Sequence, residues 1–235
     1  MLTTLRDFRR VAHLEYLPLP GGEAAIRRPS RLAVAYLLHT LGTVPALPFL
    51  ESISDAEQRL LKQMTERRVR TPMTSSCGRL FDAVAALVGL RGEVTYEAQA
   101  AMELEAVSYE GANATDALLY PFAIEGTRIR LGALLKSIVA DVQARVPVPV
   151  IGWRFHQSLA EMVRDVCLRI RAQEQVHGVA LSGGCWQNRL LLGATLSRLR
   201  DAGFTVYTHT QTPPNDGGIS LGQAVVAAAR LTQAS

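Results

Sequence analysis

The last sixty residues contain the pattern that most restricts the fold of this chain of 235 residues. Two short apolar runs, 179–181 and 204–208, predict strands, and each is followed by a segment with helical character. The predicted helices span 186–200, with Gly203 as the stop signal, and the stretch from the Pro-Pro-Asn-Asp-Gly-Gly turn to about 231. Strand, helix, strand and helix joined by short loops predict a parallel sheet with flanking helices, which is an α/β fold.

Helical signals dominate the sequence before this pattern. Ser54 and Glu57 have the spacing of a capping box, which predicts a helix from there to about Arg67. The other predictions are a strand within the first twenty residues, helices at 31–41, 78–88 and 97–107, a hairpin formed by 119–124 and 127–131, and two helices separated at Pro147 and Pro149.

Composition excludes several classes of protein. With 48% hydrophobic and 20% charged residues, the chain has enough apolar material for a core. The net charge of +4 comes from dispersed basic residues, which argues against a nucleic-acid or membrane-surface partner. An apolar stretch of the roughly 18 residues that a membrane span needs is absent, as is the apolar region of a secretory signal. Three widely spaced cysteines are typical of reduced thiols in a cytoplasmic protein.

The first candidate site is Ser182-Gly183-Gly184, between a predicted strand and a predicted helix. Two glycines leave backbone N–H groups open at the positive end of a helix, where a phosphate or a nucleotide can bind. A tight turn without a ligand is the commoner interpretation of this triplet alone. Asn188 lies one helical turn further on and can offer its amide to a base, although such a residue more often lies on a helix surface.

A second glycine turn contains Asn215, Asp216, Gly217 and Gly218. The carboxylate of Asp216 either caps the following helix or offers a hard oxygen ligand to a divalent cation. Both glycine turns follow strands of the same predicted sheet, and ligands of open α/β sheets bind at the carboxyl ends of strands. We therefore expect the two turns to lie side by side.

Two further residues have two possible roles each. Asp82 is predicted opposite the apolar stripe of its helix, either as a solvated surface residue or as a partner for a ribose diol. His156 shares an apolar face with Leu159 and Val163, which favours a buried and hydrogen-bonded histidine. The histidines have no metal-binding spacing, and the sequence lacks the G-x-S-x-G elbow of a serine hydrolase.

Six blocks, in order, resemble the HypF family of hydrogenase maturation carbamoyltransferases. Residues 179–191, VALSGGCWQNRLL, are similar to the family signature ALSGGxxQNRLL, and residues 213–223, PPNDGGISLGQ, are similar to its segment PPNDGGxxLGQ. The remaining blocks lie at 19–25, 74–84, 96–105 and 154–160.

This resemblance implies the C-terminal portion of an actin/hexokinase-like (ASKHA) fold. Residues 71–235 would form its second lobe with the nucleotide and metal turns, and residues 1–70 would be a remnant of the first lobe or an inter-lobe segment. The implied function is transfer of a carbamoyl group from carbamoyl-adenylate to the C-terminal cysteine of a HypE-type partner. The resulting thiocarbamate becomes a cyanide ligand of the nickel–iron hydrogenase site.

The resemblance also implies roles for individual residues. Asp82 would bind the ribose, the turn Ser182-Gly183-Gly184 and Asn188 would bind the nucleotide, and Asp216 would bind a divalent metal, zinc or iron. The reaction needs no nucleophile from this chain, so no catalytic residue is assigned and Cys185 is expected to serve packing.

The sequence departs from the family at several points. It lacks the closely spaced histidines that supply the other metal ligands, and Ala98 stands where the family usually has Gly. We therefore expect a C-terminal portion of a HypF-type protein, whose partners include the first lobe and the domain that makes carbamoyl-adenylate from carbamoyl phosphate and ATP. The alternatives are an enzyme like the tRNA threonylcarbamoyl transferase, and a non-catalytic scaffold that binds a protein partner.

Overall fold

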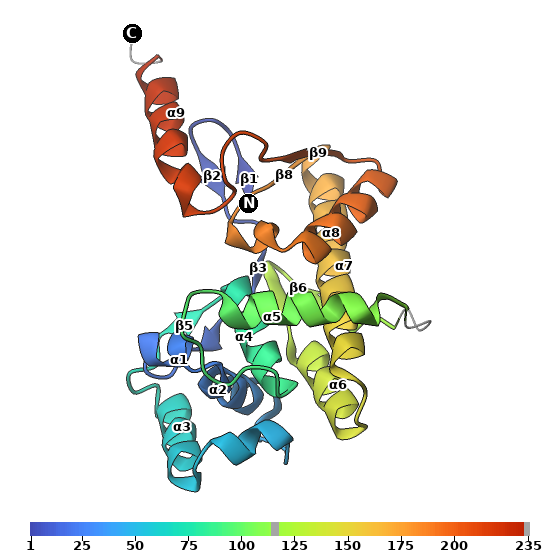
Figure 1. Ribbon diagram of the computed structural model, residues 1–235. Coiled ribbons are helices and arrows are strands. Elements are labelled where there is room, and N and C mark those ends of the chain that lie inside the picture. Colours follow the sequence, from blue (N-terminus) through green and yellow to red (C-terminus); the bar gives the residue numbers. More distant parts are fainter. Residues whose placement is uncertain (114–117, 233–235) are drawn as a thin grey trace. The chain divides into compact units, whose positions relative to one another are not determined.

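The computed structural model describes residues 1–113 and 118–232 (Figure 1). The chain divides into two compact units. One unit is Leu14–Ser158, and the other combines Met1–His13 with Leu159–Ser235. This division rests on contacts within the chain and does not test the predicted lobes. The assignment of residues 1–70 and 71–235 to lobes therefore stays a prediction.

The unit Leu14–Ser158 is built around two adjacent helices, α2 (Pro29–Leu41) and α4 (Cys77–Leu87). Its other elements are β4 (Leu17–Pro18), α1 (Glu23–Arg27), η1 (Pro48–Ser52), α3 (Asp55–Arg67), β5 (Met73–Thr74), α5 (Gln99–Ser108), η2 (Tyr109–Asn113), β6 (Ala123–Glu125), β7 (Arg128–Arg130), α6 (Gly132–Gln143) and the first part of α7 (Val148–Glu174). Strands β4 and β5 pair antiparallel, and β7 pairs with both β6 and β3 (His13–Leu14). The predicted helices are confirmed in this unit. The predicted hairpin forms as well, but its first strand is Ala123–Glu125 and not 119–124.

Local sequence explains where these helices begin and end. The Ser54 hydroxyl accepts a hydrogen bond from the backbone N–H of Glu57 at 3.3 Å, as the capping box predicts. Ser76 caps α4 in the same way through the backbone N–H of Arg79. Gly42 ends α2 in the left-handed conformation, with φ of 74°.

The core of this unit places aromatic rings of α4 and α7 against one another. The ring centroids of Phe81 and Phe155 are 5.0 Å apart in an edge-to-face arrangement, and His156 meets Phe81 at 5.2 Å. His156 is fully buried, and its Nδ1 lies 2.7 Å from the carbonyl oxygen of Gly152. The expected buried and hydrogen-bonded histidine is therefore confirmed.

The second unit contains the parallel sheet predicted from the C-terminal pattern. Strands β8 (Gly178–Leu181) and β9 (Thr205–Thr208) pair in parallel, joined by α8 (Arg189–Asp201). Buried Leu181, Leu199 and Phe204 form the centre of its core. The guanidinium of Arg171 stacks over the Phe204 ring at 4.3 Å. The remaining elements are β1 (Leu2–Thr3), β2 (Phe8–Arg9), the part of α7 after Ser158, η3 (Gly184–Gln187), η4 (Asp216–Gly218) and α9 (Ile219–Leu231).

Two predictions need correction. The expected helix 186–200 begins at Arg189, because η3 is a 3₁₀ turn and Asn188 caps α8. The expected single strand near the N-terminus is instead a series of two-residue strands, β1 to β4. Within the described ranges, none of the helices has both the length and the apolar character needed to cross a membrane.

Ala98 leads to a first testable prediction. It precedes α5 in the left-handed conformation, with φ of 61° and ψ of 8°, which is unfavourable for a residue with a Cβ. We expect Ala98→Gly to raise the free energy of unfolding by about 0.5–1 kcal/mol, since relief of strain exceeds the added entropy of the unfolded chain.

The matched control is Ala101→Gly, three residues further on inside α5. There the backbone is helical, so glycine should lower the free energy of unfolding by about 1 kcal/mol. Urea unfolding of the three proteins measures both changes. Destabilisation by both glycines would contradict the strain at Ala98.

Candidate functional site

The two glycine turns lie side by side at the carboxyl end of the parallel sheet. The register pairs Leu181 with Thr208, so both strands end at the same edge. The backbone N–H of Gly183 donates to the carbonyl oxygen of Pro214 at 2.7 Å, which joins the turns directly. The juxtaposition expected from the strand pattern is therefore confirmed.

Backbone geometry explains the glycines in these turns. Gly183 has φ of 107°, a region that residues with a side chain rarely adopt. A Cβ on Gly217 would lie 2.8 Å from Cγ of Pro213, and one on Gly218 would lie 2.9 Å from the Pro213 carbonyl oxygen. The second turn therefore needs glycine for close packing, whereas the first needs it for its backbone conformation.

His209 belongs to this site, although no motif in the sequence indicated it. Its Nε2 lies 3.0 Å from the Ser182 hydroxyl and its Nδ1 lies 3.2 Å from the Thr212 hydroxyl. This chain of hydrogen bonds connects the first glycine turn with the loop that leads to the second. The signal available in the sequence was position alone, because His209 directly follows β9 at the carboxyl edge of the sheet.

Asn188 has a structural task as the N-cap of α8. Its Oδ1 accepts a hydrogen bond from the backbone N–H of Leu191 at 2.8 Å. Because this oxygen already accepts a hydrogen bond from the helix, the amide nitrogen of Asn188 is the atom that could contact a base.

Asp216 is exposed, and Asn215 makes the capping contact in its place. Asn215 Oδ1 accepts from the backbone N–H of Gly217 at 3.1 Å. Within residues 1–113 and 118–232, the Asp216 carboxylate has no hydrogen-bond or ion-pair partner. The capping role proposed for Asp216 is therefore wrong, and its carboxylate is open to solvent and to a ligand.

Asp82 lies in the unit Leu14–Ser158, whereas both glycine turns belong to the other unit. Its side chain is 4% exposed and pairs with the Arg79 guanidinium at 2.8 Å. Burial raises the pKa of this carboxyl to about 6, and the charge of Arg79 opposes that rise. The alternative of Asp82 as a solvated surface residue is wrong, because α4 is buried on all sides from Leu80 to Leu87.

Comparison with known proteins identifies the family. The family model described as "Carbamoyltransferase, Kae1-like Domain, second subdomain" matches residues 1–223. The chain belongs to this carbamoyltransferase family. It is 35% identical over 240 residues to the carbamoyltransferase HypF of Synechocystis, covering 94% of this chain and 30% of that protein. It is 32% identical to a HypF homolog of Cupriavidus necator, covering 97% of this chain and 59% of that protein.

Solved HypF structures have the same fold as this chain. A crystal structure of full-length HypF in the phosphate- and nucleotide-bound form matches with a TM-score of 0.88 and 37% identity, covering 97% of this chain and 30% of that one. The HypF of T. kodakarensis matches with a TM-score of 0.83 and 26% identity, with coverage of 97% and 31%. The actin/hexokinase-like α/β fold is thereby confirmed. The chain spans less than a third of the length of either structure.

A metal centre needs more ligands than the described residues of this chain bring together. Among the residues that the structure describes, no group of three or more His, Cys, Asp or Glu side chains is placed to hold an ion. Asp216 offers one carboxylate, whereas a divalent metal ion bound to a protein takes several protein ligands. The donor set described here therefore does not fit a complete metal site.

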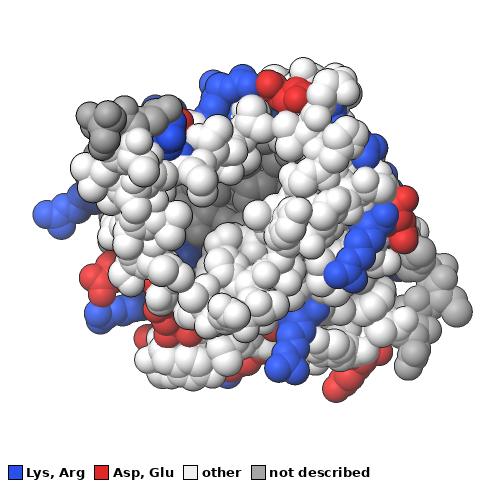
Figure 2. Space-filling model, turned by 90° about the horizontal axis from the view of Figure 1, so that it is seen from above, with Lys and Arg blue, Asp and Glu red and all other residues white. Residues whose placement is uncertain are grey.

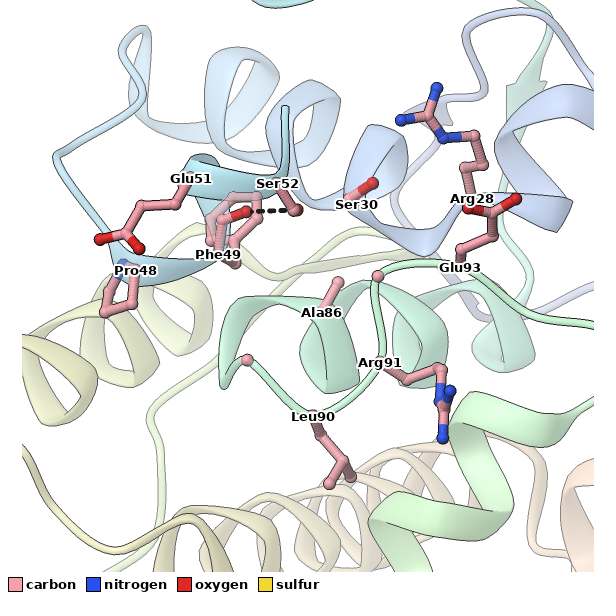
Figure 3. Close-up of a pocket in the computed structure, with 12 residues that line it drawn as sticks. Arg28, Ser30, Pro48, Phe49, Glu51, Ser52, Ala86, Leu90, Arg91 and Glu93 are labelled. Carbon is pink, nitrogen blue, oxygen red and sulfur yellow. Dashed lines mark hydrogen bonds between the residues drawn. The ribbon is translucent and has the colours of Figure 1, made fainter. Parts of the chain in front are cut away.

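A cavity in the unit Leu14–Ser158 lies outside these turns (Figure 3). It has a volume of about 540 Å³, and residues of η1, the start of α2 and the loop 89–93 line it. Two arginines line it, but Arg28 pairs with Glu57 at 2.7 Å and Arg91 forms a two-pronged pair with Glu103 at 2.7 Å. Glu51 and Glu93 line the cavity as well, so its lining offers a phosphate no excess positive charge.

Surface charge bears on the alternative of a tRNA-modifying enzyme. On the face shown in Figure 2, Lys and Arg side chains are scattered and interspersed with Asp and Glu. Binding of nucleic acid favours basic residues gathered on one face. Both this distribution and the family match favour the HypF assignment.

Proposed function

We propose that this chain forms the second-subdomain part of a HypF-type carbamoyltransferase, and that its joined glycine turns hold the adenylate of carbamoyl-adenylate. The observation that supports this most is the hydrogen bond from Gly183 to Pro214, because it joins two ligand-accessible turns at one sheet edge. A similar solved protein is a HypF in a phosphate- and nucleotide-bound form, which agrees with a nucleotide as ligand.

The proposed reaction is an acyl transfer to sulfur. A cysteine thiolate of a HypE-type partner attacks the carbamoyl carbon, a C–S bond forms, and the bond from that carbon to the phosphate oxygen breaks. The electron pair leaves with AMP, and the thiol proton is lost to solvent when the thiolate forms. The protein's task is to orient the mixed anhydride and to stabilise the departing phosphate.

Residues of the glycine turns are suited to this task. The Gly183 N–H is engaged by the Pro214 carbonyl oxygen, so in this proposal the other backbone N–H groups of the Ser182–Gly184 turn face the departing phosphate, and Asn188 provides an amide for the base. His209 holds the Ser182 hydroxyl at 3.0 Å, which fixes one polar group of the turn. Asp82 is proposed as the ribose ligand, which requires its carboxylate to exchange the contact with Arg79 for one with the sugar.

Asp216 is proposed to supply one oxygen to a divalent metal, zinc or iron. Because the described residues do not complete such a site, no step above depends on the ion. The proposed partners are the first lobe, the domain that forms carbamoyl-adenylate and the HypE-type acceptor. The proposed role is cyanide-ligand synthesis for nickel–iron hydrogenase in the cytoplasm.

Asp216→Asn tests this function. The chain replaces the matching region of the Synechocystis HypF, and mass spectrometry follows carbamoylation of the acceptor cysteine. We expect transfer to fall at least about 10-fold, as for a lost charge-assisted contact. The free energy of unfolding should change by less than about 0.5 kcal/mol, since this exposed carboxylate has no hydrogen-bond or ion-pair partner among the described residues.

Asp201→Asn is the control, because Asp201 is an exposed carboxylate at the end of α8, away from both turns. It should leave carbamoyl transfer unchanged. Full transfer by the Asp216→Asn protein would remove Asp216 from the site. A chimera that folds but transfers nothing, even with Asp216 intact, would contradict the proposed function itself.

A further inference from the structure

The cavity in the unit Leu14–Ser158 is lined by a buried polar group that the fold itself does not use (Figure 3). Ser30 lies in the first turn of α2 and is 3% exposed. Its hydroxyl has no hydrogen-bond partner among the residues that the structure describes. The Ser52 hydroxyl, by contrast, donates to the carbonyl oxygen of Phe49 at 2.7 Å. A buried hydroxyl without a partner is costly, so Ser30 is a group that a ligand in the cavity would satisfy.

Gly92 keeps the space in front of these two serines open. Its carbonyl oxygen accepts from the backbone N–H of Ser30 at 3.2 Å, which holds the loop 89–93 against the start of α2. A Cβ at Gly92 would lie 3.7 Å from Cβ of Ser30 and 3.7 Å from Oγ of Ser52. A side chain there would therefore enter the space that both serines border. The cavity, of about 540 Å³, has the size of a small-molecule site.

Carboxylates lie at both ends of the cavity. In Figure 3, Glu51 lies on η1 at one end, and Glu93 lies at the opposite end beside the start of α2. Both are exposed, and neither forms an ion pair within the described ranges. Phe49 and Ala86 line the part between them. The cavity thus has an apolar middle and a negative charge at each end.

The arginines around the cavity are already paired with other carboxylates. Arg28 pairs with Glu57, and Arg31 contacts the same carboxylate at 2.8 Å. Arg91 pairs with Glu103. With the carboxylates at the two ends, three arginines and four glutamates surround the cavity, which leaves an excess of one negative charge. An anionic ligand would meet unpaired charges of its own sign, whereas a ligand with a cation at each end would complement both carboxylates.

We propose that this cavity binds an aliphatic diamine or polyamine. One ammonium group pairs with Glu51 and another with Glu93, and the methylene chain packs against the apolar middle. The Ser30 hydroxyl accepts a hydrogen bond from an N–H group of the ligand, which gives this buried group the partner it lacks in the described chain. The cavity belongs to the unit Leu14–Ser158 and the glycine turns to the other unit, so this site is separate from the proposed carbamoyl transfer.

Titration calorimetry of the full chain with spermidine, 1,4-diaminobutane and butylamine tests this proposal. Spermidine and 1,4-diaminobutane should bind saturably at one site. Butylamine should bind at least about 5-fold more weakly than the diamine, because it reaches one carboxylate only. Combining Glu51→Gln with Glu93→Gln should weaken spermidine binding about 10-fold or more, as for the loss of two exposed ion pairs. Gly92→Ala should also weaken it, and the fold should tolerate the methyl group because its contacts at 3.7 Å are ordinary ones.

Glu110→Gln is the matched control, because Glu110 is an exposed carboxylate on η2 in the same unit but does not line the cavity. This variant should bind spermidine like the parent chain. The proposal would be overturned by equal affinity for butylamine and 1,4-diaminobutane, or by undiminished spermidine binding in the double variant. Absence of saturable binding up to about 10 mM would overturn it as well. So would an equal loss in Glu110→Gln, since spermidine would then gather at carboxylates anywhere on the surface. None of these measurements depends on carbamoyl transfer, so their failure is distinct from failure of the proposed function.

Discussion

Lowering the pH from 7 to 4 is expected to remove about 3 kcal/mol of folding free energy through His156 alone. Burial among the rings of Phe81 and Phe155 lowers the pKa of His156 from 6.5 to about 4. Below pH 6.5 the unfolded chain therefore takes up a proton that the folded chain does not. The stability from neutral His156 is complete above pH 6.5 and is lost as the pH falls toward 4.

Comparison with His156→Gln isolates this contribution. Glutamine keeps a donor for the Gly152 carbonyl but does not titrate, so its free energy of unfolding should not contain this loss. Urea unfolding of both proteins at several pH values between 4 and 7 gives the difference directly. The parent should lose about 3 kcal/mol relative to the variant across this interval. A constant difference would show that His156 titrates normally in the folded chain.

The helices were predictable where local chemistry determines them. Ser54 caps α3 as its spacing with Glu57 indicates, and the parallel pairing of β8 and β9 follows from the alternation of strands and helices. The short strands near the N-terminus were not predictable, because β4 exists through its pairing with β5, more than fifty residues away in the printed sequence. Tertiary pairing of this kind leaves little local signal.

Periodicity failed at Asp82 for a physical reason. A pattern shows which side of a helix is most apolar, but it does not show how many neighbours cover the helix. Helices α2, α5 and α6 all contact α4, so even the side bearing Asp82 is buried. The charge is tolerated there because Arg79, three residues earlier, reaches it.

The location of the site was predictable from the sequence, but its hydrogen bonds were not. Strand order alone placed the glycine turns at one edge, and the Gly183–Pro214 bond agrees. Which of the neighbours Asn215 and Asp216 caps the turn depends on backbone angles that the sequence does not reveal. His209 was missed because its partners, Ser182 and Thr212, meet it only after the strands pair.

Asp82→Asn is expected to stabilise the protein progressively as the pH rises, by about 2.5 kcal/mol between pH 4 and pH 7 relative to the parent. Burial raises the pKa of Asp82 from 3.8 to about 6, so the folded chain keeps a proton that the unfolded chain has released. The parent's stability from protonated Asp82 is complete below pH 3.8 and is lost as the pH rises through 6. Asparagine has nearly the same size, and its amide oxygen still accepts from Arg79.

This substitution also separates the two roles of Asp82. His156 and Asp82 change stability in opposite directions over the same pH interval, so each variant is compared with the parent at each pH by urea unfolding. If the carboxylate holds the ribose, Asp82→Asn in the chimera should weaken ATP binding by about 1.5–3 kcal/mol while the fold becomes more stable. A merely structural Asp82 would give the gain in stability with unchanged ATP affinity. A stability difference that does not vary with pH would contradict the raised pKa, and with it the account of Asp82 as a buried and costly charge.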